Sequence, residues 1–91
     1  MPAEHFVPRF AQELQASSRV QANALKALAL ANPTAPENEW KELAAAALIV
    51  GAKWEGQQWE QGEVAKTMGI NERKVGQHYQ MLADTLKKAI R

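Results

Sequence analysis

The chain has 91 residues, which suffices for one domain over residues 1–91 and is too short for a second hydrophobic core. Hydrophobic residues make up 46% and charged residues 23%, a composition that excludes a disordered tail. The formal net charge of +1 provides no overall attraction to nucleic acid or anionic lipid, and the absence of cysteine excludes disulfides and thiolate chemistry. The longest apolar run, residues 43–50, is too short to cross a bilayer, and the first residues show no secretory signal.

Helical periodicity runs along the chain and predicts an all-α fold of five helices. The first is expected over about residues 3–15, where Pro8 either kinks the helix or lies in its first turn. Its apolar stripe consists of Phe6, Phe10 and Leu14. The second helix is expected to begin after a cap at Ser17 or Ser18 and to stop before Pro33.

The third helix is expected to begin in the segment 34–37, which matches the capping-box pattern, and to run to about Trp54. Residues spaced three and four apart form its buried seam: Trp40, Leu43, Ala47, Val50 and Trp54. Most of the residues between them are also apolar, which indicates a helix surrounded by others. This helix is therefore predicted to be the centre of the core.

The last two helices are predicted to form a helix-turn-helix over about residues 60–89, with the final helix starting at Asn71. Ala65 is small where the helices would cross, Gly69 allows the left-handed turn between them, and Val75 would hold the second helix against the first. The alternative is a plain helical hairpin with no nucleic-acid role.

Charge is unevenly distributed along the chain. Residues 37–63 carry two basic and six acidic residues, whereas the chain from Val64 onward carries six basic and two acidic ones. These counts give formal charges of −4 and +4, so the two regions are expected to prefer different partners. Solvated helix faces are the alternative explanation.

The final helix should bury one stripe and present a polar face that can contact a DNA groove. The predicted buried stripe is Val75, Tyr79, Leu82 and Leu86. The candidate DNA-binding residues are Gln61, Asn71, Arg73, Lys74, Gln77, His78 and Gln80. Among them, Gln61 could hold a phosphate at a helix N-terminus, and Asn71 could also cap the final helix.

No pattern in the sequence predicts a catalytic residue, a metal site or a cofactor. His5 and His78 are far apart, and neither has a ligand partner one helical turn away. Two acidic pairs at helical spacing lack a convergent histidine or cysteine: Glu39 with Glu42, and Glu60 with Glu63. The chain is therefore not expected to be an enzyme.

Beyond these patterns, the sequence resembles a cyclin-like repeat of transcription factor IIB and of its archaeal counterpart, transcription factor B, most closely the second repeat. The resembling segments are residues 6–14, 19–21, 43–49, 55–56, 61–65 and 69–70, together with Ala24 and Tyr79. The resemblance implies a five-helix cyclin fold that docks on TATA-box-binding protein and double-stranded promoter DNA. RNA polymerase is a further implied partner. The implied location is the cytoplasm of an archaeal-like cell or a eukaryotic nucleus.

The chain departs from this family in the helix that would read DNA. Gly76 stands where the family usually carries a base-contacting arginine, and Arg73 replaces an apolar residue. Lys74 stands where a threonine is common, and His78 where archaeal members tend to carry arginine. These differences predict an altered or lost sequence readout.

A second departure lies before the third helix. The family's short glycine- and proline-containing loop, which approaches the DNA backbone, is replaced by the longer segment 33–39. Its acidic residues and one that follows would repel phosphate: Glu37, Glu39 and Glu42. These features favour an alternative function, a cyclin-fold protein-interaction adaptor without sequence-specific DNA readout.

Overall fold

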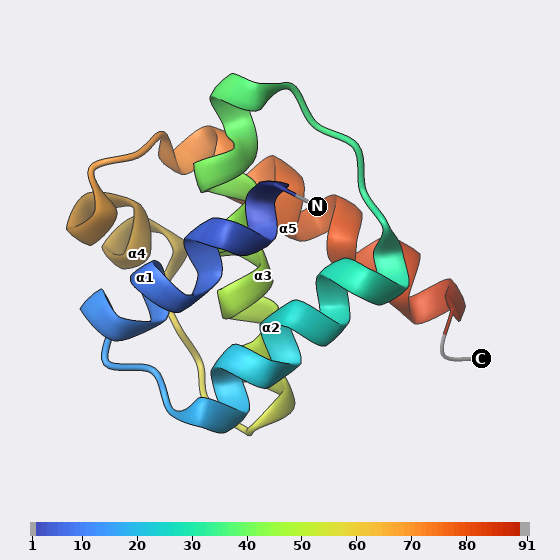
Figure 1. Cartoon of the computed structure of the whole chain (residues 1–91), viewed down its shortest axis with the longest axis horizontal. Helices are drawn as coiled ribbons and strands as arrows, with labels where there is room; N and C mark the ends of the chain where they lie inside the picture. Colours follow the sequence, from blue (N-terminus) through green and yellow to red (C-terminus); the bar gives the residue numbers. More distant parts are fainter. Residues whose placement is uncertain (1, 90–91) are drawn as a thin grey trace.

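A computed structural model describes residues 2–89 and shows five α-helices and two short 3-10 helices in this part of the chain. The elements are η1 (Pro2–His5), α1 (Phe6–Glu13), α2 (Ser18–Ala31), η2 (Glu37–Glu39), α3 (Trp40–Trp54), α4 (Gln61–Met68) and α5 (Glu72–Ala89) (Figure 1). The prediction of an all-α fold with five helices is confirmed. The molecule measures 34 × 28 × 21 Å along its principal axes.

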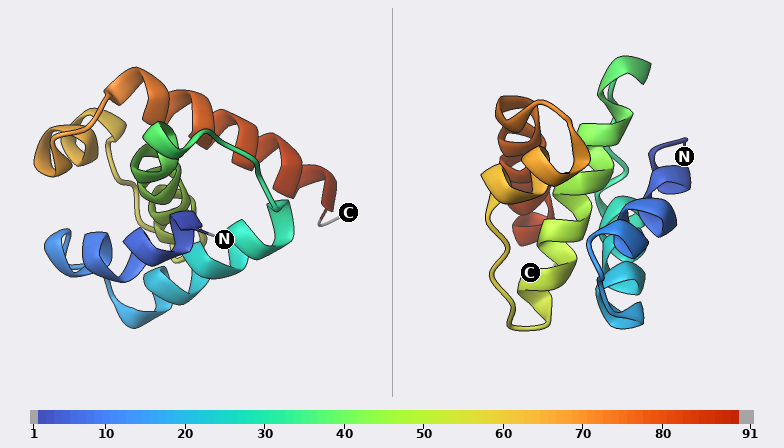
Figure 2. Two further views of the ribbon diagram at one scale, coloured as in Figure 1. Left: turned by 45° about the horizontal axis from the view of Figure 1, so that its top comes forward. Right: turned by 90° about the vertical axis from the view of Figure 1, so that its left-hand side faces the viewer.

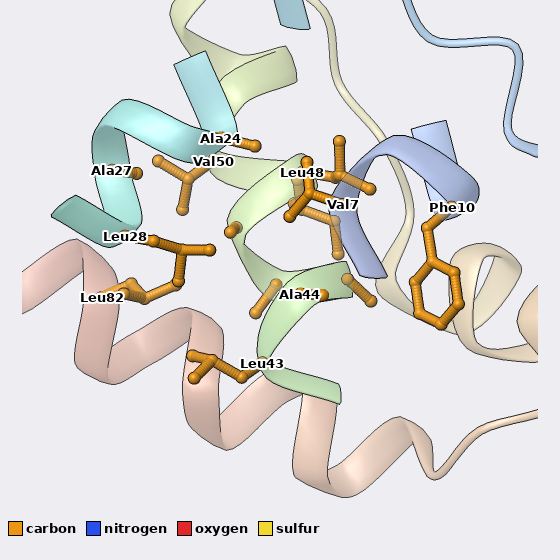
Figure 3. Close-up of a cluster of buried hydrophobic side chains, with 14 of the residues drawn as sticks. Val7, Phe10, Ala24, Ala27, Leu28, Leu43, Ala44, Leu48, Val50 and Leu82 are labelled. Atoms are coloured by element: carbon orange, nitrogen blue, oxygen red, sulfur yellow. The ribbon is translucent and has the colours of Figure 1, made fainter. Parts of the chain in front are cut away.

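Helix α3 is the centre of the fold. Seen from the side, it lies between α1 and α2 on one face and α4 and α5 on the other (Figure 2). All residues from Leu43 to Ala52 are buried. Side chains from α1, α2 and α5 converge on this helix, among them Val7, Leu28 and Leu82 (Figure 3). The predicted central role of this helix is therefore confirmed.

The start of α3 and the burial of its last residue differ from the prediction, whereas its end at Trp54 agrees with it. The helix begins at Trp40 because residues 37–39 form a 3-10 turn after Pro36, and no side chain caps that turn. The indole Nε1 of Trp40 donates a hydrogen bond to the carbonyl oxygen of Ala35 at 3.0 Å, which holds this turn against the helix. At the other end, Trp54 is 38% exposed, so its assignment to the buried seam is wrong. It lies at the last residue of the helix, beyond the buried stretch.

The first two helices follow the predicted signals closely. Residues 2–5 form the 3-10 turn, and Pro8 lies in the first turn of α1, which was one of the two placements expected for it. The Ser17 hydroxyl accepts a hydrogen bond from the amide of Val20 at 3.2 Å and so caps α2. Asn32 ends α2 in a left-handed conformation with φ of 44°.

Within residues 2–89, every helix is too short or too polar to cross a lipid bilayer.

Candidate nucleic-acid interface

The turn between α4 and α5 has the predicted geometry. Gly69 adopts a φ of +67°, and the amide of Ile70 donates to the carbonyl oxygen of Ala65 at 3.0 Å. This bond closes the end of α4 in the manner of a glycine C-cap. Ala65 and Val75 are both buried, as expected for residues that lie at a helix crossing. These contacts fix the orientation of α5 relative to α4.

Asn71 serves as the cap of α5. Its Oδ1 accepts a hydrogen bond from the amide of Lys74 at 3.1 Å. Its own amide donates to Oε2 of Glu42 at 3.2 Å. The predicted capping role is confirmed, and these bonds engage the Asn71 side-chain oxygen and its main-chain amide within the protein.

Helix α5 separates a buried stripe from an exposed one. Val75, Leu82 and Leu86 are buried as predicted, whereas Tyr79 is half-buried. The phenol oxygen of Tyr79 lies 3.5 Å from the Lys53 ammonium group and accepts a hydrogen bond from it.

The exposed stripe consists of Arg73, Gln77 and Gln80, at successive spacings of four and three that place them on one helix face. The Gln80 amide donates to Asp84 Oδ1 at 3.3 Å, a bond at the protein surface. These three predicted residues are therefore together and open to a partner. We call this set the polar stripe.

Gln61 lies over Gly76 of α5. Its Oε1 would be 3.0 Å from a Cβ atom built on Gly76, so the glycine makes room for this side chain. The carboxylate of Glu72 lies close to Gly62 in the first turn of α4, with Oε2 3.2 Å from a Cβ atom placed there. A negative charge at this point opposes the binding of phosphate at the N-terminus of α4.

Lys74 and His78 point away from the polar stripe and share one carboxylate. Lys74 Nζ lies 3.2 Å from Glu39 Oε2, and His78 Nε2 lies 2.9 Å from Glu39 Oε1. The hydrogen bond from His78, followed by that from Lys74, holds the pKa of Glu39 below its ordinary value of 4.5. We call these three residues the Glu39 clamp.

The placement of His78 beside the exposed face is a wrong expectation, because the structure buries this residue. Position 78 is one turn beyond buried Val75 and therefore faces the core side of α5. Lys74 keeps 42% of its side chain exposed.

Residues 1–85 match the family described as the transcription factor TFIIB repeat. The chain belongs to this family. A TFIIB repeat is a cyclin-like, non-enzymatic domain of a transcription factor, which agrees with the absence of enzyme signatures predicted from the sequence. A comparison with curated proteins found no match to the chain.

The acidic segment of this TFIIB repeat faces inward to a larger extent than expected. Glu39 and Glu42 contact α5 and its cap, whereas Glu37 is exposed. Only 8% of Glu42 is accessible, and its Oε1 has no hydrogen-bond partner within residues 2–89. Two of the three carboxylates expected to repel phosphate therefore position the helix that would read DNA.

Sequence reasoning missed this arrangement. Glu39 is separated from Lys74 and His78 by 35 and 39 residues, so no local spacing connects the carboxylate to its two partners. The only signal was the grouping of acidic residues before α3 and of basic residues in α5.

The TFIIB repeat also has a hollow of about 310 Å³ between the end of α1 and α4. Apolar, acidic and neutral polar side chains line it: Leu14, Gln58, Trp59, Glu60, Glu63, Val64 and Thr67. We call it the acidic hollow. Within residues 2–89, no group of three or more histidine or acidic residues could hold a metal ion.

Proposed function

We propose that the chain is the DNA-binding domain of a transcription initiation factor and corresponds to the second repeat of transcription factor B. Residues 60–89 would act as its helix-turn-helix, and residues 1–91 would form one repeat unit. Family membership implies TATA-box-binding protein, DNA and polymerase as partners in general. The observation that carries the proposal for this chain is the polar stripe on α5. In the proposed role the chain acts wherever promoter DNA is present, in an archaeal-like cytoplasm or a nucleus.

Each residue of the polar stripe suits a particular contact with a duplex. The Arg73 guanidinium can bind a phosphate or the acceptor edge of guanine, and the amides of Gln77 and Gln80 can pair with adenine. All three lie within the first three turns of α5, where a recognition helix meets the major groove. Gln61 adds an amide next to Gly76, which lies one helical turn from both Arg73 and Gln80 on α5.

Replacing Arg73 with alanine should weaken binding to a promoter duplex about tenfold at low salt and reduce the slope of log affinity against log salt by about 0.9. The reason is that one phosphate contact, with its released counterion, is lost. Fluorescence anisotropy of a labelled duplex at several salt concentrations, with and without TATA-box-binding protein, measures both quantities.

The matched control is Arg9→Ala. Arg9 lies on α1, its side chain is 70% exposed, and its loss removes the same charge far from the polar stripe. The proposal is contradicted if the chain does not bind a duplex at low salt, either with or without TATA-box-binding protein. It is also contradicted if the Arg73→Ala variant binds as tightly as the wild-type chain.

A protein-interaction adaptor is the second candidate function, and the acidic hollow favours it. Leu14, Trp59 and Val64 offer apolar contact, while Glu60 and Glu63 provide negative charge at the same place. A helical segment with lysine and leucine side chains has the complementary chemistry.

A lysine- and leucine-rich helical peptide should shift the amide resonances of the residues that line the acidic hollow. The double variant E60Q/E63Q should bind this peptide about fivefold more weakly because two attractive charges are removed. E37Q is the control for removing one carboxylate elsewhere on the surface, since Glu37 is exposed in a different element, and it should leave peptide binding unchanged. Resonance shifts caused by DNA should instead centre on α4 and α5. Peptide shifts scattered over the whole surface would exclude the adaptor function.

A further inference from the structure

Resting on the proposed DNA-binding function, we propose that Glu39 occupies an anion-binding site on α5 in the free chain and competes there with a DNA phosphate. The site is formed by Lys74 and His78. The Glu39 carboxylate takes the place that an oxyanion of the DNA backbone would take on Lys74, so it lowers the affinity of α5 for DNA. The clamp therefore sets the strength of binding at the proposed site.

The contacts of Glu39 show how the site is filled. Each carboxylate oxygen has its own donor, with His78 at 2.9 Å and Lys74 at 3.2 Å. The two donors are one helical turn apart on the same side of α5, which allows one anion to reach both. Glu39 itself is the last residue of η2, directly before α3, and is only 18% exposed in its side chain. The carboxylate is thus held in place by the fold.

The two donors, His78 and Lys74, differ in how accessible they are to a duplex. His78 is 9% exposed in its side chain and stays covered, whereas Lys74 is 42% exposed. Lys74 also follows Arg73 directly, so a phosphate near Arg73 lies within the span of its flexible four-carbon side chain. We infer that phosphate and Glu39 compete for Lys74, and that the hydrogen bond with His78 keeps Glu39 in place.

The balance of charges permits this exchange. An ion pair that is partly exposed is weak, whereas a duplex offers closely spaced phosphates and a gain from released counterions. While the pair with Glu39 persists, the positive charge of Lys74 is neutralised and contributes little to DNA binding. Removal of the carboxylate charge should therefore strengthen binding, which is opposite to the effect of disrupting a structural contact.

The decisive variant is Glu39→Gln, which keeps the shape of the side chain and an acceptor for His78. We expect it to bind the promoter duplex about threefold to tenfold more tightly than the wild-type chain, with a salt slope steeper by about 0.9. Glu37→Gln removes the same charge from the same 3-10 turn, but Glu37 forms no ion pair within residues 2–89, and the variant should change affinity less than twofold. Circular dichroism verifies that both variants fold.

A double-mutant cycle with Lys74→Gln locates the effect. In the wild-type background this variant should change affinity less than Arg73→Gln does, because Glu39 already neutralises Lys74. In the Glu39→Gln background it should abolish the gain. Lys74 is a partly exposed helix position whose only side-chain partner among residues 2–89 is Glu39, so the comparison with Arg73→Gln remains decisive even if Glu39→Gln fails to fold.

The outcomes separate this inference from the proposed function. If Arg73→Ala weakens binding but Glu39→Gln equals the wild-type chain or Glu37→Gln, the competition is refuted and the DNA-binding function stands. A gain that survives in the double variant, or a loss in Lys74→Gln as large as in Arg73→Gln, also refutes it. If neither the wild-type chain nor Glu39→Gln binds a duplex at low salt, both proposals fail.

Discussion

Replacing Gly51 with alanine should lower the free energy of unfolding by about 2–3 kcal/mol. A Cβ atom at this position would lie 2.5 Å from the carbonyl oxygen of Val20 and 3.0 Å from the amide nitrogen of Ala24. Both obstacles are main-chain atoms of α2, so the clash is relieved only if the two helices separate. Urea unfolding followed by far-UV circular dichroism measures the change.

Gly76→Ala is the matched control for this substitution. Here the new Cβ would meet Oε1 of Gln61 at 3.0 Å, which is the end of a flexible side chain that can turn aside. Alanine is also the better helix former, so this variant should gain about 0.5–1 kcal/mol. If both variants change stability by the same amount and sign, the close approach of α2 and α3 is not what restricts position 51.

Truncation of Leu82 to alanine should destabilise the chain by about 2–5 kcal/mol, because it removes a buried side chain and leaves a cavity. Leu82 is 1% exposed and joins α5 to the core next to Leu28 of α2 (Figure 3). A domain of this size has a total free energy of unfolding of about 5–15 kcal/mol, so the expected loss is a large fraction of its stability. The same urea titration measures the loss.

Met81→Ala provides the comparison within the same turn of α5. Met81 is 57% exposed, and its truncation should change the free energy of unfolding by less than about 0.5 kcal/mol. An equal loss at positions 81 and 82 would show that α5 is attached to the core in a different orientation. A different orientation of α5 would also move the polar stripe, because the rotation of α5 about its axis determines which residues are exposed.

The fold was predictable where the governing interactions are local. Gly69, Asn71 and the buried stripe of α5 depend on residues within one or two helical turns, so their spacing in the sequence is sufficient. The same rule misplaced Trp54, because helical periodicity continues past the point at which neighbouring helices stop covering α3. Helical periodicity also gave no information on Gly51, because the need for glycine there comes from the close approach of α2.

The candidate site was only partly predictable for the same reason. Exposure of Arg73, Gln77 and Gln80 follows from helix geometry alone. Lys74 lies between the buried and the exposed faces and His78 at the edge of the buried face, and spacing within α5 does not reveal the distant partner that both of them contact. That partner, Glu39, lies in another element, so only the folded chain reveals the pairing.

The centre of α3 has a mechanical consequence for the whole repeat. Residues 44–47 are four consecutive alanines, each with no accessible surface. Such short side chains have no rotamers through which to absorb a displacement, and a close-packed interior transmits strain. A displacement of α1 or α2 should therefore be transmitted through α3 to α5. If both proposed functions hold, a ligand beside α1 and a duplex on α5 would be coupled through this helix, and the coupling would be reciprocal.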